Sequence, residues 1–158
     1  MDGQPNSPEG VTSYSPRQVS PTASARILVV EDDADIRRLN TEVLIRHGYQ
    51  VDAAEDGAVA WDALQLNRYD LMVTDNAMPK VTGVELLHKM HAAKMDLPVI
   101  MATGSFPNTE SKRDPWLRPT AIVLKPYTID ELLVAVMDVL RETADTINSG
   151  QDKSSCAQ

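Results

Sequence analysis

Cysteine and basic residues are scarce in this sequence. The single cysteine, Cys156, cannot form an internal disulfide or a cysteine-based zinc site, so we expect a reducing compartment. There are 15 Lys and Arg against 23 Asp and Glu, which gives a formal net charge of −8. Because a nucleic-acid backbone is bound by a basic surface, this balance argues against a nucleic-acid partner.

Long apolar runs are also missing. No run approaches the length needed to cross a membrane, and no segment joins a basic start to a long apolar core. We therefore expect a soluble, cytoplasmic protein without a membrane partner. Large apolar residues are sparse at both ends as well, so we predict disordered tails over 1–25 and 144–158. That leaves one folded domain over 26–143.

Within this domain, short apolar runs alternate with amphipathic segments. Four runs are continuous, as is typical of parallel strands covered on both faces: 26–30, 70–74, 98–103 and 121–124. A fifth run, 49–54, alternates more and is predicted to be an edge strand. The repeated order of strand, helix and strand predicts an α/β fold with a doubly wound, five-stranded parallel sheet.

The helices between the strands have readable ends. A helical stripe after the first strand stops just before Gly48, and its members are Ile36, Leu39, Val43 and Leu44. Thr82 and Thr128 are each followed three residues later by a glutamate, which is the pattern of a capping box at a helix start.

Charged or hydroxyl side chains stand at the ends of four of the five predicted strands. They are Glu31 and Asp32 after the first, Asp75 after 70–74, Thr103 at the end of 98–103, and Lys125 after 121–124. Ligands of an open α/β sheet bind outside the carboxyl ends of its strands. Asp75 taken alone would be an ordinary turn residue, but the whole set at one edge predicts a functional site.

The chemistry of this set is specific. Crowded carboxylates repel one another unless a cation lies among them, and hard oxygen ligands suit Mg²⁺. A metal and Lys125 would neutralise phosphoryl oxygens while the carboxylate of Asp75 attacks phosphorus. The strand ends therefore predict a magnesium-dependent phosphoryl-transfer site.

Four motifs in order, ILVVEDD (27–33), VTDNAMPKVTG (73–83), IMATG (100–104) and VLKPY (123–127), resemble the receiver domain of bacterial two-component response regulators. The resemblance covers about 26–143 and implies a flavodoxin-like strand order 2-1-3-4-5. It also implies that the peptide bond between Lys125 and Pro126 is cis.

The resemblance assigns a role to each site residue. Asp75 would accept a phosphoryl group from a histidine kinase or a histidine phosphotransfer protein. Mg²⁺ would be bound by Asp32, Asp75 and the backbone carbonyl of Ala77, with Glu31 acting through water. Thr103 and Lys125 would contact the phosphoryl oxygens. Asp33 competes for the acidic role, but the family's acidic pair directly follows the two valines, which favours Glu31 and Asp32.

The sequence departs from the family at two places. Ile122 stands three positions before the lysine, where the family usually has an aromatic switch residue. Three prolines between Thr103 and Lys125 predict a short or irregular fourth helix, because proline disrupts helix interiors. We also predict that 105–118 is mobile at rest and orders or shifts on phosphorylation.

The function predicted from these features is that of a single-domain response regulator, since the segment after the last helix is too short for an output domain. It would catalyse only its own phosphorylation and dephosphorylation, and would signal by binding an unknown downstream protein. Two alternatives stay open: a receiver-like module that is not phosphorylated, and an aspartyl-nucleophile phosphatase. The phosphatase is disfavoured because Ala77 stands where it needs a second carboxylate. His88 and His91 are interpreted as ordinary helix residues.

Overall fold

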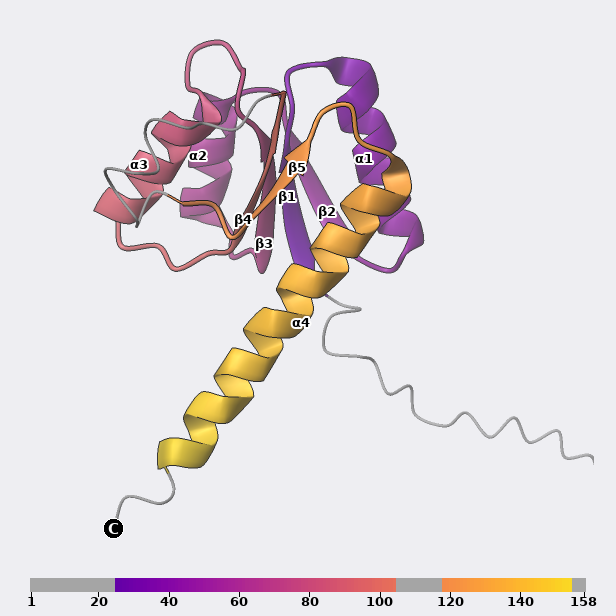
Figure 1. The fold of residues 1–158 in the computed structure, drawn as a ribbon. Coiled ribbons are helices and arrows are strands. Elements are labelled where there is room, and N and C mark those ends of the chain that lie inside the picture. Colours follow the sequence, from indigo (N-terminus) through magenta and orange to yellow (C-terminus); the bar gives the residue numbers. More distant parts are fainter. Residues whose placement is uncertain (1–24, 105–117, 155–158) are drawn as a thin grey trace, which may run out of the picture.

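The five apolar runs form one parallel sheet. The structure, a computed structural model, describes residues 25–104 and 118–154. Its strands are β1 (Arg26–Val30), β2 (Gln50–Ala54), β3 (Leu71–Asp75), β4 (Val99–Thr103) and β5 (Ala121–Leu124). They pair in the order β2-β1-β3-β4-β5, with β2 at an edge (Figure 1). The predicted doubly wound sheet, its strand order and the edge position of β2 are therefore confirmed.

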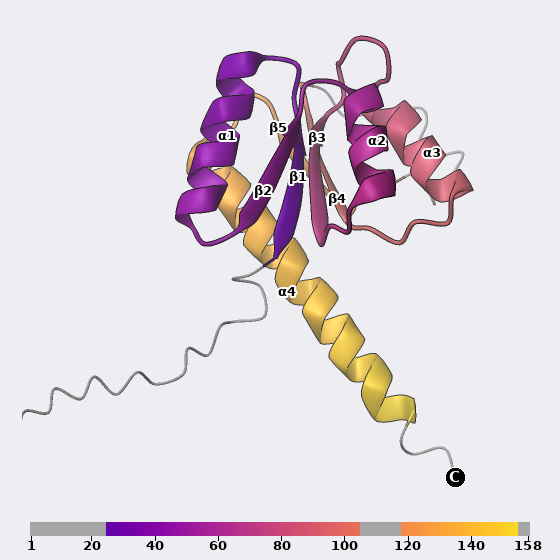
Figure 2. The same ribbon diagram turned by 180° about the vertical axis from the view of Figure 1, so that it is seen from behind.

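Helices cover both faces of the sheet. They are α1 (Ala34–Arg46), α2 (Gly57–Leu66), α3 (Gly83–Ala92) and α4 (Ile129–Ser154). Helices α1 and α4 lie on one face and α2 and α3 on the other (Figures 1 and 2). The predicted irregular fourth helix lies outside the described residues, and so does the predicted mobile segment 105–118 except for Arg118. None of the helices in the described part of the chain is long and apolar enough to cross a membrane.

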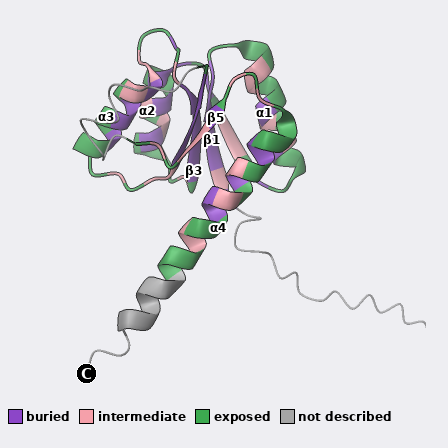
Figure 3. Ribbon diagram, in the orientation of Figure 1, coloured by how far each residue is buried: buried purple, intermediate pink, exposed green. Residues whose placement is uncertain are grey.

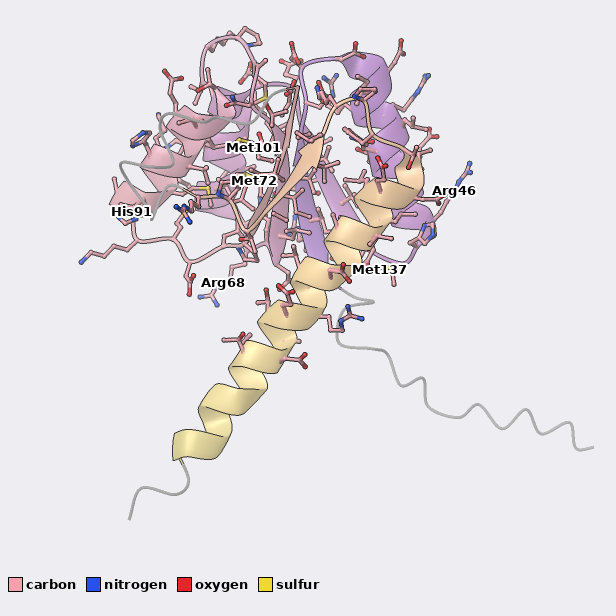
Figure 4. All side chains as sticks on the ribbon, in the orientation of Figure 1. Arg46, Arg68, Met72, His91, Met101 and Met137 are labelled. Carbon is pink, nitrogen blue, oxygen red and sulfur yellow. The ribbon has the colours of Figure 1, made fainter. Side chains whose placement is uncertain are left out.

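Alternate strand residues feed two hydrophobic clusters, because side chains point to opposite faces along a strand. Ile27, Val29 and Ile100 pack with α1 and α4 on one face. Met72 on β3 and Met101 on β4 lie in the other cluster, between the sheet and helices α2 and α3 (Figure 4). The central strands β1, β3 and β4 are accordingly buried on both faces in the centre of the molecule (Figure 3). This rigid centre fixes the carboxyl ends of β1, β3 and β4.

The predicted helix ends are confirmed. Thr82 and Glu85 form a reciprocal capping box at the start of α3. Thr128 and Glu131 exchange the same two bonds at the start of α4, at 3.2 and 2.9 Å. Gly48 follows His47, the C-cap of α1, and adopts a left-handed conformation with φ of 94°, which glycine tolerates without steric cost.

Two predictions about the helices were wrong. Leu39 is 46% exposed, and the polar Asn40 is buried in its place with 4% exposure. Helix α4 continues to Ser154, so the predicted disordered tail is helical over 144–154. Tails were predicted from composition alone, but a polar segment can extend a helix whose first turns are already fixed by packing.

Candidate functional site

Three carboxylates meet at the carboxyl ends of two neighbouring strands. Glu31 and Asp32 follow β1, Asp75 is the last residue of β3, and β1 pairs with β3 in parallel. One carboxylate oxygen from each of the three residues lies within 4.8 Å of the other two. Glu31 and Asp75 are buried, with 3% and 5% exposure, whereas Asp32 is exposed. The cluster thus opens to solvent on the side of Asp32.

A lysine that follows β5, the strand at the other edge of the sheet from β2, completes the cluster. The Nζ atom of Lys125 lies 3.1 Å from Oδ2 of Asp75 and 3.6 Å from Oε2 of Glu31. Burial alone would lower the pKa of Lys125, but the hydrogen bond to Asp75 and the charge of Glu31 outweigh it and raise the pKa. Lys125 therefore stays a cation and offsets part of the repulsion among the carboxylates.

The carboxylate of Glu31 is costly to ionise. Burial raises its pKa to about 7, the charge of Asp75 adds to this effect, and the backbone N–H of Asp33 and the ammonium of Lys125 oppose it. The ammonium of Lys125 thus offsets only part of the effect of burial and of the Asp75 charge on Glu31.

Thr103 and Ala77 belong to the neighbouring strand β4 and to the loop after Asp75. Thr103 is the last residue of β4 and is buried, one position beyond the pairing of Asp75 with Ala102. The backbone N–H of Ala77, in the loop after β3, donates to Oδ1 of Asp75 at 3.2 Å. The carboxylate of Asp75 is thus held from two directions, by this N–H and by Lys125.

Asp33 and Ile122 lie outside the carboxylate cluster. Asp33 is the N-cap of α1 and accepts hydrogen bonds from the N–H groups of Asp35 and Ile36, at 2.9 and 3.1 Å. Its carboxylate lies outside the grouping of three. Ile122 is half-buried on β5 and lines an open groove of about 820 Å³ between β5 and α4.

The structure also adds two residues to which the sequence analysis assigned no role in the site. The guanidinium of Arg37, on α1, donates to the backbone carbonyls of Glu31 at 2.8 Å and of Asp32 at 3.4 Å. Gly83 packs so closely that an added Cβ would lie 2.8 Å from the carbonyl oxygen of Asp75. Gly83 is the last residue of the motif VTDNAMPKVTG, so the sequence offered a signal that could have marked it as part of the site. Arg37 was one of several charged residues on an exposed helix, and nothing in its spacing marked it.

The comparisons with known proteins agree with this geometry. A family model described as the response regulator receiver domain matches residues 27–137. The response regulator MprA of Mycobacterium sp. (strain KMS) is 35% identical over 121 residues, which cover 75% of this chain and 52% of that protein. The chain therefore spans about half the length of the curated relatives it matches.

Solved structures show the same fold. The receiver domain of the Francisella response regulator 1452 superposes with a TM-score of 0.69 at 26% identity, covering 76% of this chain and 99% of that one. The response regulator TrrA of Thermotoga maritima, solved in complex with Mg²⁺ and BeF, gives a TM-score of 0.63 at 33% identity. That match covers 72% of this chain and 97% of TrrA.

Proposed function

This chain belongs to the response regulator receiver domain family, and on that premise we propose that Asp75 accepts a phosphoryl group from a histidine kinase or a histidine phosphotransfer protein. The observation that carries the proposal is the position of the Asp75 carboxylate at the end of the central strand β3. It is grouped with Glu31 and Asp32 on one side and lies 3.1 Å from the ammonium of Lys125 on the other.

The donor set fits Mg²⁺. Three carboxylates lie within 4.8 Å of one another, and hard oxygen donors with an opening to solvent match the coordination of this ion. In the proposal, Asp32, Asp75 and the carbonyl of Ala77 hold the ion, and Glu31 contributes through water. When bound, Mg²⁺ supplies positive charge to the phosphoryl oxygens. The relative TrrA was solved with Mg²⁺ and BeF, which supports this assignment.

The residues of the chain then have defined tasks. An oxygen of Asp75 attacks phosphorus, the P–O bond forms as the P–N bond of the donor phosphohistidine breaks, and the imidazole leaves with the electron pair. Lys125, already beside Asp75, pairs with a phosphoryl oxygen. The hydroxyl of Thr103 donates a hydrogen bond to another. Both groups stabilise charge that the transfer brings into the site.

The output that we propose is the binding of a downstream protein in response to phosphorylation. Ile122 occupies the family's aromatic switch position, and it borders the groove between β5 and α4. A change at Thr103 would reach this groove through the pairing of β4 with β5, in which Thr103 lies opposite Leu124. In this scheme the domain is a switch that turns over only its own phosphoryl group.

Intact-mass spectrometry after incubation with acetyl phosphate and Mg²⁺ tests the proposal. The protein should gain one phosphoryl group, and Asp75→Asn or excess EDTA should abolish the gain. Asp33→Asn is the matched control, because asparagine still caps α1 and the side chain lies outside the carboxylate grouping. An unlabelled wild type, or Asp75→Asn labelled like the wild type, refutes the proposal.

A further inference from the structure

A buried amide links α1 to the loop that carries Lys125. Asn40 is 4% exposed, and its Nδ2 donates to the hydroxyl of Tyr127 at 2.8 Å across 87 positions of sequence. An amide buried on the core-facing side of a helix is costly unless it is hydrogen-bonded. If either Asn40 or Tyr127 moved, the buried amide would lose this hydrogen bond.

Tyr127 lies two residues after Lys125, on the short connection between β5 and α4. It is half-buried, and its ring packs against the hydrophobic cluster that α1 and α4 share. On the strand side, the backbone N–H of Lys125 donates to the carbonyl of Thr103 at 2.9 Å. The segment with the lysine is thus fixed at one end by β4 and at the other by Asn40. In both ribbon views α1 lies beside the beginning of α4 (Figures 1 and 2).

The same helix also holds the acidic side of the site. Arg37, one turn before Asn40, donates to the carbonyl of Glu31 at 2.8 Å. Through these two side chains α1 is bonded both to Glu31, which follows β1, and to Tyr127, which lies two residues after Lys125. The lysine Nζ lies 3.1 Å from Asp75 and 3.6 Å from Glu31.

We infer that Asn40 is a positioning residue for phosphoryl transfer, which holds Lys125 beside Asp75 through its hydrogen bond to Tyr127. The inference rests on the proposed function, since it concerns the rate at which Asp75 is phosphorylated. The amide of Asn40 donates to Tyr127 and not to a carboxylate of the site. Its loss should therefore change the time that Lys125 spends beside Asp75 and leave the binding of Mg²⁺ intact.

The test uses the full chain and two substitutions that remove the bond from opposite sides, Asn40→Leu and Tyr127→Phe. Leucine suits the apolar stripe of α1, and phenylalanine retains the packed ring, so the second variant serves if the first does not fold. Val43→Ala is the matched control, because Val43 packs against the same cluster one turn along α1. Labelling rates are measured at saturating acetyl phosphate and Mg²⁺, and the amide resonance of Lys125 is recorded without the donor.

Each bond-removing variant should label about fivefold more slowly, the effect of one lost hydrogen bond on a rate constant. The Mg²⁺ concentration at half-maximal rate should stay unchanged. The Lys125 amide resonance should shift in both variants and not in Val43→Ala. Unchanged rates in folded variants, or equal slowing in Val43→Ala, overturn the inference while the proposed function stands. If the wild type is not labelled, the proposed function fails, and the amide resonance alone decides whether Asn40 positions Lys125.

Discussion

Gly83→Ala is the substitution that most directly tests how the backbone of the site is packed. Gly83 is the first residue of α3, and a Cβ there would lie 2.8 Å from the carbonyl oxygen of Asp75 and 3.0 Å from Cα of Asn76. It would also lie 3.2 Å from Cε of Met101. The methionine end can rotate away, but the two backbone atoms cannot move without shifting the end of β3. The methyl group therefore presses on the residue that carries the proposed phosphoryl group.

The magnitude follows from two opposing effects. Overpacking of this kind costs about 1–3 kcal/mol, whereas alanine gains up to about 1 kcal/mol over glycine in a helix and less at its first position. We expect a net loss of about 1–2 kcal/mol in the free energy of unfolding. For a chain of this size that lowers Tm by roughly 2–8 °C. The labelling rate of Asp75 should fall as well, because its carboxylate moves with the strand end.

Gly104→Ala is the matched control. Gly104 directly follows Thr103 and is exposed, and within the described residues no atom beyond its chain neighbours lies within 4 Å of an added Cβ. This variant should be as stable as the wild type or gain up to about 1 kcal/mol, because alanine restricts the unfolded chain. Urea unfolding followed by far-ultraviolet circular dichroism compares the three proteins. If Gly83→Ala unfolds at the same urea concentration as Gly104→Ala and labels normally, the close packing under Asp75 is refuted.

Three further predictions concern the metal, the pH dependence and the switch position. Mg²⁺ at about ten times its Kd should stabilise the protein by about 1.4 kcal/mol, seen as a rise in Tm. Asp32→Asn should lose this rise and Asp33→Asn should keep it, and the reverse pattern would exchange the two assignments. Asp56, the N-cap of α2, has its pKa lowered below 3.8 by the N–H of Val59 and, less strongly, by Lys80. Such a group adds stability above its ordinary pKa that is lost as the pH falls through its lowered value. The stability advantage of the wild type over Asp56→Asn in urea should therefore shrink below about pH 4, and a constant advantage would contradict this. Ile122→Tyr should change the free energy of unfolding by less than about 1 kcal/mol, because the residue borders an open groove, and a larger loss would mean that the groove is closed.

The strands were accessible from the sequence because parallel strands buried on both faces are written as continuous apolar runs. Their order was predicted from the resemblance to receiver domains. The candidate site was accessible for a related reason. Parallel strands deliver the residues that follow them to one edge of the sheet, so Glu31, Asp75 and Lys125 had to converge once the sheet was recognised. The capping boxes at Thr82 and Thr128 were equally readable, because each is a bond between residues three apart.

The tertiary structure decided what local patterns leave open. Successive helix residues are about 100° apart, so Leu39 lies at one border of the stripe of α1 and Asn40 within it. Which of the two is buried depends on what packs against the helix, and the partner that accepts Asn40, Tyr127, comes from 87 residues away. The role of Arg37 depends likewise on where the carbonyl of Glu31 points after β1. The sequence by itself determined the fold and the chemical groups of the site, because these follow from local periodicity and from strand ends. Only the tertiary structure decided how α1 holds those groups in place, because that depends on contacts between segments far apart in the chain.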